Sequence, residues 1–426
     1  MMLWIALLFT GLLLAFRAEC YSQCCAAGNP VNTANAADGS QAGVLGVSVS
    51  YMRSYSDTYF QGASVSDYKY IDYSSFDYSM ISAGYGLFPD LQLTAELGYF
   101  FSKLQKFDFG DGFAPLRKAG GIGDGTLGIV YNLMYNEDFL LGIYPSIKVT
   151  LPLGEFDQMD GAVVMPIDIQ PSSGSFKYTI GATVSKGFDE SPLALLAMGS
   201  YEISQRIETD RTNYKYGNQL NISLIGLYSL TDAIFGSAGG FAESISAGLE
   251  LRYNFREKSS DRDKKLIEST GGSVLFVAPR ISFGFKGGWA LNAQFDLPVL
   301  KDINGIQLTN KNAFTLGFSM SFDLKNSDNE GLLPGEDDFA GNPRAEFRVE
   351  GICGMCKSRI ENAAAKIENV VFAYWNEESK ILTVRYDKSL DISLLKKAIA
   401  LAGHDNDMFK ATDEDYSKLH SCCKYR

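Results

Sequence analysis

The middle of the chain alternates apolar and polar residues with a period of two. In runs such as Leu91–Phe101, Ile245–Phe255 and Phe314–Phe322, aliphatic or aromatic residues share one face, and Ser, Thr, Gly or charged residues share the other. This alternation is typical of β-strands with one apolar face. Together with the run Trp289–Leu297 and further segments centred near residues 48, 81, 128, 145, 180, 197, 224 and 280, it predicts twelve strands between residues 43 and 324.

The connections between these strands alternate between long and short. Tight turns such as Pro89-Asp90 and Gly287-Gly288 follow the even-numbered strands, whereas long polar stretches follow the odd-numbered ones. This asymmetry predicts an all-β transmembrane barrel of about 12 antiparallel strands in the outer membrane, closed so that no strand edge is unpaired in lipid. Both ends of the barrel are then periplasmic. The long stretches are Ser54–Ser74, Lys103–Ala119, Gly154–Ser173, Gln205–Gly217, Arg256–Thr270 and Lys301–Lys311.

The amino terminus contains an apolar run, Leu3–Phe16, which has the length of a signal-peptide core and is too short to span a bilayer. It predicts a signal peptide at residues 1–20 and a periplasmic amino-terminal segment at residues 21–42. A lipid anchor on Cys20, Cys24 or Cys25 is the alternative. No later segment is apolar over the roughly 18 residues that a transmembrane helix needs, so we expect no such helix.

The overall charge and the positions of the reactive residues exclude two classes of function. The formal net charge is −12, and the chain lacks the clusters of Lys and Arg that neutralise nucleic-acid phosphates, so we expect no nucleic-acid partner. Every Cys and His lies before residue 26 or after residue 352. Because barrel enzymes of the phospholipase and protease types depend on a histidine, we expect no enzymatic activity.

The polar face of the predicted strands carries charges of both signs among many Ser, Thr and Gly residues. It predicts a polar lumen. A barrel of this size is narrow, so the lumen is either an open channel or is plugged by these side chains and its own loops. The charged residues on this face are Lys148, Glu202, Glu250, Arg252, Arg280, Lys286 and Asp296.

Three short motifs stand out in the barrel region. Gly121–Gly125 reads Gly-Ile-Gly-Asp-Gly, but neither a helix nor a Lys-Ser/Thr pair follows it, which argues against a phosphate-binding loop. Together with Lys148–Gly154 and Gln170–Ser175, this motif resembles the outer-membrane barrels of the putative transporter family of the phenol meta-cleavage pathway. The resemblance implies a transporter-like barrel and does not fix its substrate.

The periodicity changes after residues 325–343, an acidic stretch containing Gly-Leu-Leu-Pro-Gly that is predicted to be a solvated linker. Strand patterns end at Gly351 and cover Val370–Trp375 and Ile381–Asp387, and two helical patterns, the second at Leu390–Ala402, separate them. With a short last strand near Met408, this order predicts a small α+β ferredoxin-like βαββαβ domain at residues 344–412. A tail containing Cys and His follows at residues 413–426.

Cys353 and Cys356 stand at the predicted start of the first helix of this domain. Two thiolates at this spacing can point at one ion, and a helix amino terminus lowers their pKa toward the metal-binding form. Soft sulfur donors favour Cu(I), and Zn(II), Cd(II) or Hg(II) become feasible if more ligands join. The residues that could be accessory ligands are His404, His420, Cys422 and Cys423. Equally, the histidines could lie at the surface and the Cys pair could be oxidised or free.

The segment Gly351-Ile-Cys353-Gly-Met-Cys356-Lys-Ser-Arg-Ile360-Glu361 closely resembles the heavy-metal-associated domain of copper chaperones and metal-pump tails. The resemblance covers nearly all of Arg344–Asp407 and implies a soft-metal site at the two cysteines. One residue separates Gly351 from Cys353, where the family usually has two. A structural disulfide and a thioredoxin-like redox pair are the alternatives for this Cys-x-x-Cys pair in an oxidising compartment.

These features together predict an outer-membrane transporter-like barrel with a periplasmic soft-metal-binding domain, acting in heavy-metal, first of all copper, transport or homeostasis. The expected partners are outer-membrane lipid, the metal ion and a periplasmic metal-donor or metal-acceptor protein. The alternative is a general solute channel or membrane anchor whose metal domain only sequesters or senses metal. The two hypotheses differ in whether metal ions cross the membrane.

Overall fold

The computed structural model describes residues 42–108, 115–136, 139–161, 163–188, 191–231, 234, 242, 244–285, 287–324, 342–352, 354–377, 379–419 and 423–426. The predicted signal peptide, the amino-terminal segment up to residue 41 and residues 325–341 of the predicted linker lie outside these residues. The chain divides into two compact units, Met1–Lys325 and Asn326–Arg426. Among the described residues, no helix is long and apolar enough to cross a membrane.

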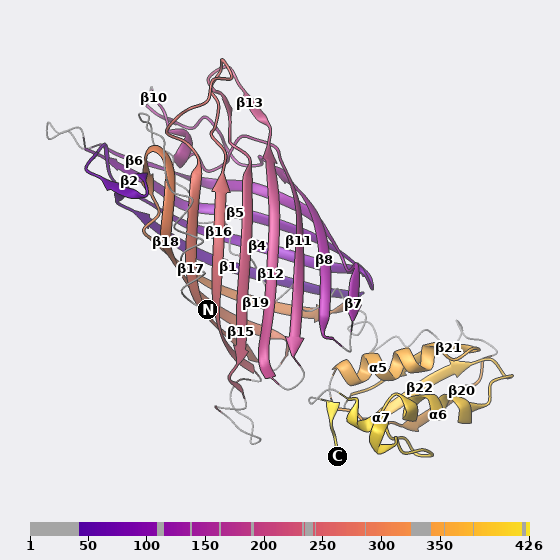
Figure 1. Ribbon diagram of the computed structural model, residues 1–426. Coiled ribbons are helices and arrows are strands. Elements are labelled where there is room, and N and C mark those ends of the chain that lie inside the picture. The colour runs from indigo at the N-terminus through magenta and orange to yellow at the C-terminus, as the bar shows by residue number, and fades with distance from the viewer. Residues whose placement is uncertain are drawn as a thin grey trace. The chain divides into compact units, whose positions relative to one another are not determined.

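The first unit is a closed antiparallel β-barrel, whose strands wrap around a lumen in Figure 1. Each wall strand pairs with its neighbours in the sequence, and the barrel closes where the first wall strand pairs with the last from Val44↔Asp323 to Tyr55↔Asn312. The prediction of a twelve-strand antiparallel barrel is confirmed. The wall strands are β1 (Val44–Ser56), β4 (Ile71–Phe88), β5 (Leu91–Phe107), β6 (Leu116–Tyr131), β8 (Leu141–Leu151), β11 (Lys177–Phe188), β12 (Ser191–Ser204), β15 (Gln219–Ser229), β16 (Ser244–Arg256), β17 (Gly272–Phe285), β18 (Trp289–Thr309) and β19 (Asn312–Asp323).

The period-two alternation separates the two faces of the barrel wall. Leu97 of β5 and Leu249 of β16 are nearly half exposed, whereas their chain neighbours Glu96 and Glu250 take part in ion pairs and Glu250 is only 1% exposed. Large apolar side chains therefore cover the outer surface, and polar ones face inward. An apolar outer surface with a polar interior suits a barrel surrounded by lipid.

The strands extend further than predicted at the rim that carries the long loops. The stretch Lys301–Lys311, predicted as a loop, mostly continues β18 and pairs with the short strand β2 (Thr58–Gly62). A register shift after Ile303 takes up the turn-forming pair Asn304-Gly305, and Gly305 has a φ of +58°. Residues that favour a turn thus form a bulge inside a strand, because Gly tolerates this backbone conformation at little cost.

Most of the other long stretches also contain short elements of their own. Lys103–Ala119 is in large part the ends of β5 and β6, and Gly154–Ser173 contains a single 3-10 turn, η2 (Ile167–Ile169). The remaining short strands are β3 (Ser64–Ser66), β7 (Met134–Asn136), β9 (Met159–Asp160), β10 (Val163–Val164), β13 (Arg206–Glu208) and β14 (Asn213–Lys215).

The second unit is a small α+β domain around one hydrophobic core. Its antiparallel sheet has the order β20-β22-β21, and Ile360, Trp375, Leu382, Leu395 and Ile399 are completely buried where the helices pack on the sheet. The predicted ferredoxin-like fold is confirmed. The elements are β20 (Arg344–Arg348), α5 (Gly354–Ala365), β21 (Val370–Trp375), β22 (Ile381–Tyr386), α6 (Ile392–Leu401) and α7 (Asp413–Ser417).

The last strand of the predicted βαββαβ order is reduced to a single β-bridge, Val349↔Asn406. The side-chain oxygen of Asn406 accepts hydrogen bonds from the backbone N–H groups of Met408 and Phe409. This turn, closed by an Asn side chain, bends the chain away after one bridge residue. The strand predicted near Met408 is therefore absent from the described residues.

The described part of the tail, predicted as a segment after the domain, packs into the domain core. Leu419 contacts Gly403 so closely that a Cβ on Gly403 would lie 2.8 Å from the Leu419 side chain. Gly403 also has a φ of +94°, which favours glycine. Cys423 is almost fully buried in the same core as Cys356. Residues 413–419 and 423–426 therefore contribute to the stability of the domain.

We expect the full chain, folded in detergent, to migrate faster on electrophoresis before heating than after it. All wall strands are hydrogen-bonded on both sides, so the barrel should resist the denaturing detergent until it is heated. The measurement is a comparison of unheated and boiled samples. A protein that remains soluble without detergent and shows one mobility would contradict a membrane barrel.

Candidate metal centre and barrel lumen

Cys356 lies in the first turn of α5 and is completely buried. Its sulfur accepts a hydrogen bond from the backbone N–H of Ile352 at 3.4 Å. Backbone N–H groups and the helix dipole at this end of a helix stabilise a thiolate relative to a thiol. Cys353 lies outside the described residues, and its place in the chain is directly before the helix start at Gly354.

The backbone that leads into this helix is packed tightly against the core. A Cβ on Gly351 would lie 2.9 Å from Cys356 Cβ and 3.0 Å from the Trp375 ring. Trp375 is itself fully buried and donates its indole N–H to the Val349 carbonyl at 3.0 Å. Only glycine leaves room for this close approach, so Gly351 and Trp375 position the cysteine segment.

His404, which follows α6, contacts the chain just before the cysteine segment. It is completely buried, and its Nδ1 donates to the Glu350 carbonyl at 2.8 Å. Nδ1 must carry the proton in this contact, because a carbonyl oxygen only accepts. Nε2 is then unprotonated, and it has no hydrogen-bond partner among the described residues. Burial lowers the pKa of His404, and the nearby Arg359 lowers it further, against the raising effects of the Glu350 hydrogen bond and Asp405.

The carboxyl-terminal residues hold the loop that carries His404. The Tyr425 ring stacks on the His404 ring with 6.1 Å between centroids, and the Tyr425 hydroxyl donates to the Gly403 carbonyl at 3.1 Å. The Asp405 backbone N–H donates to the same hydroxyl at 2.6 Å, and Arg426 forms an ion pair with the Asp405 carboxylate. The tail thus contacts both neighbours of His404 in the chain.

The structure places the candidate ligands unequally. Cys356, His404 and Cys423 are all buried in the second unit, whereas Cys353, His420 and Cys422 lie outside the described residues. Within the part of the chain that is described, no three Cys, His, Asp or Glu side chains form a ready-made metal cluster. His404 is therefore not a surface residue, which was the alternative for it from the sequence, and Cys423 is buried as well.

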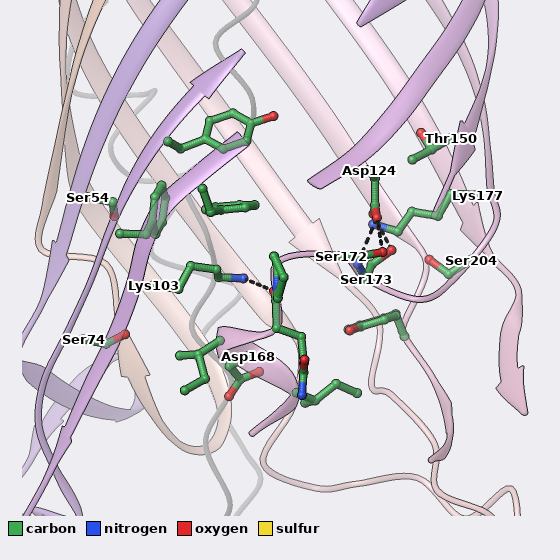
Figure 2. A pocket seen from close by; sticks show the side chains of 18 of the residues that line it. Ser54, Ser74, Lys103, Asp124, Thr150, Asp168, Ser172, Ser173, Lys177 and Ser204 are labelled. Atoms are coloured by element: carbon green, nitrogen blue, oxygen red, sulfur yellow. Dashed lines mark hydrogen bonds between the residues drawn. The ribbon is translucent and has the colours of Figure 1, made fainter. Parts of the chain in front are cut away.

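A different constellation occupies the barrel lumen, where the stretch after β8 folds inward. Asp124 of β6 accepts hydrogen bonds from the Ser172 hydroxyl at 2.7 Å, from the Ser173 backbone N–H at 3.0 Å and from the Ser173 hydroxyl. Lys103 of β5 donates to the Gln170 carbonyl at 2.8 Å (Figure 2). These bonds hold residues 167–175, termed here the inserted segment, against the inside of the wall.

The path of the chain from β8 to the inserted segment explains the Gly-rich motif of β6. A Cβ on Gly154 would lie 1.7 Å from the Ile122 carbonyl oxygen, so the chain leaving β8 passes in direct backbone contact with β6. The Gly121–Gly125 motif therefore lets the chain after β8 approach β6 closely, and it supplies the Asp124 carboxylate that anchors the inserted segment. The motif lies within strand β6 and does not lead into a helix, unlike a phosphate-binding loop. The three motifs that carry the resemblance to the transporter family meet at this place.

The inward-facing charges predicted from the sequence form ion pairs. Lys148 Nζ lies 2.8 Å from Glu96, and Glu202 lies 3.8 Å from Lys177. A second, buried network joins β16, β17 and β18. Lys286 lies outside the described residues. The network consists of Glu250 with Arg252 (3.6 Å) and Arg280 (3.2 Å), and of Arg252 with Asp296 (3.1 Å).

Comparison with known proteins assigns the second unit. The family model of the heavy-metal-associated domain matches residues 346–405. Copper chaperone CopZ of Staphylococcus aureus (strain bovine RF122 / ET3-1) is 41% identical over 61 residues, which are 14% of this chain and 90% of the chaperone. Through this unit the chain belongs to the heavy-metal-associated domain family. The sequence expectation of such a domain is confirmed.

Two solved structures are similar to parts of the chain. The N-terminal domain of a potential copper-translocating P-type ATPase from Bacillus subtilis, in the Cu(I)-loaded state, is 36% identical; the match covers 15% of this chain and 84% of that domain, with a TM-score of 0.15. The COG4313 outer membrane channel from Pseudomonas putida F1 is 14% identical; the match covers 66% of this chain and 96% of that channel, with a TM-score of 0.49.

We expect the heavy-metal-associated domain to lose stability as the pH falls below about 6.5. The pKa of His404 is lowered in the folded state, so below its ordinary value the unfolded chain binds a proton that the folded domain does not. His404→Phe should flatten this dependence, by at most about 1.4 kcal/mol per pH unit. Urea unfolding of residues 342–426 between pH 7.5 and 5.5 measures it. Equal pH slopes for the two proteins would show that His404 does not titrate as described.

Proposed function

We propose that this protein is an outer-membrane barrel that carries a periplasmic soft-metal-binding domain and acts in heavy-metal, first of all copper, transport or homeostasis. The observation that carries the proposal is Cys356, a buried thiol at the amino terminus of α5 in a domain of the heavy-metal-associated family. Cys353 and Cys356 would hold the ion. Binding and transfer need no catalytic group, so we assign no enzymatic activity.

The donor chemistry favours Cu(I) as the ion. Thiolates are soft donors, and a pair of them satisfies the low coordination number of Cu(I). Zn(II), Cd(II) or Hg(II) would need further ligands, for which His404 Nε2 and the Cys423 thiol are the described candidates. The similarity to copper chaperone CopZ, 41% identical over 61 residues, also favours copper.

The barrel supports the proposed location. Its outer surface is apolar and its strand count is even, so both ends of the wall leave the membrane on the same side. With an exported amino terminus, that side is the periplasm, and the domain after β19 would lie there. A periplasmic donor or acceptor protein would then exchange metal with it.

A second function is favoured by the chemistry of the lumen. The barrel region has no Cys or His, and the described ion pairs in the lumen join carboxylates to Lys or Arg. These are hard oxygen donors and cations, which do not bind Cu(I) well. The second function is therefore that of a general solute channel or anchor whose metal domain only sequesters or senses metal. Flux of Cu(I) into liposomes that contain the full chain separates the two functions.

We expect reduced residues 342–426 to bind one soft ion through Cys353 and Cys356. Replacing either residue with Ser removes a soft donor, and each single substitution should weaken Cu(I) binding by on the order of a hundredfold or more. Competition with a Cu(I) chelator measures the affinity. Cys422→Ser is the matched control, since it removes a thiol from the tail and should weaken binding only if the tail completes the shell.

One outcome of this titration contradicts the assignment. Full affinity in Cys353→Ser would mean that the ion is bound elsewhere, and the tail cysteines would become the better candidates. Because Cys356 is fully buried, circular dichroism must show that Cys356→Ser is folded before its result counts. If Cys356→Ser is not folded, Cys353→Ser provides the independent test.

Trypsin added to intact cells should cut the connection between β16 and β17 and spare the heavy-metal-associated domain. Residues 262–266 of this connection are exposed and include Arg262, Lys264 and Lys265. They follow β16, which is the ninth of the twelve wall strands, and the connections after odd-numbered wall strands face outward in the proposed topology. After the outer membrane is permeabilised, the domain should become accessible. Cleavage of the domain in intact cells would show that the assigned orientation is inverted.

A further inference from the structure

A cavity of about 260 Å³ lies in the barrel lumen, between the wall and the inserted segment (Figure 2). Wall strands β1, β4, β5 and β6 contribute to one part of its lining, and β8, β11 and β12 to another. The inserted segment contributes Ile167–Ser173. This volume lies just below the usual range of about 300–1,000 Å³ for ligand pockets, so the cavity suits a small solute.

The lining is rich in hydroxyl groups and carries three charges of each sign. Ser54, Ser74 and Ser204 are among the hydroxyl residues, and Figure 2 shows them around the cavity. Met52 is the one sulfur-bearing residue among those that line it, so the lining does not offer a soft-metal site. The charged residues are Lys103, Lys177, Arg256, Asp124, Asp168 and Glu202.

Two of the three carboxylates already have partners in the protein. Asp124 accepts the hydrogen bonds of the inserted segment, and Glu202 lies 3.8 Å from Lys177. Asp168 is different: its carboxylate has no hydrogen bond or ion pair with any described residue. Burial raises the pKa of Asp168 to about 7, and the charges of Lys103 and Arg256, which line the same cavity, oppose this rise, so the carboxylate is ionised at slightly alkaline pH. An enclosed carboxylate without a direct partner, beside two cations, can receive a positively charged group while those cations attract a negative one.

We propose that this cavity binds a small zwitterionic solute of the amino-acid class, whose ammonium group contacts Asp168 and whose carboxylate contacts Lys103 and Arg256. A simple cation would be attracted by Asp168 but repelled by Lys103 and Arg256. A simple anion would be attracted by these two cations but repelled by Asp168. The hydroxyl groups provide hydrogen bonds to the remaining polar atoms. The site concerns the barrel alone and goes beyond the proposed metal function.

The test uses the full chain, folded in detergent micelles, and four small hydroxylated probes. L-serine carries both charges, ethanolamine only the positive one, lactate only the negative one, and glycerol none. Saturation-transfer NMR, which detects weak binding without requiring an open channel, measures each affinity. We expect serine to bind at least tenfold more tightly than each of the other three probes.

Asp168→Asn should lower the serine affinity at least tenfold. Asp160→Asn is the matched control. Asp160 lies in the same connection between β8 and β11, but its carboxylate pairs with Arg117 and does not line the cavity. The unheated mobility of each variant verifies that the barrel is folded. Cys353→Ser and Cys356→Ser should bind serine normally, so failure of this proposal and failure of the metal assignment are distinguishable.

Three results would overturn the proposal. Ethanolamine binding as tightly as serine would make the cavity a cation site. Serine binding that survives Asp168→Asn, in a variant shown to be folded, would mean that Asp168 does not receive the ammonium group. Absence of detectable serine binding to the unmodified chain would leave the cavity as solvated lumen without a ligand.

Discussion

Closure of the backbone hydrogen-bond ladder is the constraint on which the rest of the barrel depends. In hydrocarbon an unpaired N–H or C=O group costs several kcal/mol, so the wall must end where it began, and the pairing of β1 with β19 achieves this. Closure forces alternate side chains inward along every strand. The lumen therefore receives many polar residues in a narrow space, and its charges must be neutralised locally, as in the network of Glu250, Arg252, Arg280 and Asp296.

The parts of the fold that depend on local pattern could be predicted from the sequence, and the parts that depend on long-range contacts could not. The twelve strands could be predicted from the period-two alternation, because one face of each strand is apolar and faces outward and the other is polar and faces the lumen. The stretch Lys301–Lys311 was wrongly predicted as a loop because a bulge at Gly305 hides a strand. The inserted segment depends on Asp124 meeting Ser172 and Ser173, residues 48 and 49 positions away.

In the candidate metal centre, the Cys-x-x-Cys spacing at a helix start is local, whereas the burial of His404 depends on the Glu350 carbonyl, 54 residues away.

The two units use different ligand chemistry. The barrel offers oxygen donors, ammonium and guanidinium groups and Met thioethers, but it has no Cys or His; Cys occurs only in the first 25 and the last 74 residues, and both His lie in the last 23. The proposed soft-metal site therefore lies in the heavy-metal-associated domain, and the proposed solute site lies in the lumen. This separation lets one chain combine a channel-like wall with a metal-binding domain without competition between their ligands.

The location of the two candidate metal ligands, Cys353 and Cys356, tests the account most directly. Trypsin releases both Cys353 and Cys356 in one peptide, Val349–Lys357, so mass spectrometry can report their modification in whole cells. The account predicts that a membrane-impermeant maleimide labels this peptide only after the outer membrane is permeabilised, and that prior loading with Cu(I) prevents the labelling. Labelling in intact cells, or labelling that appears only after the inner membrane is broken, would contradict a periplasmic soft-metal domain attached to an outer-membrane barrel.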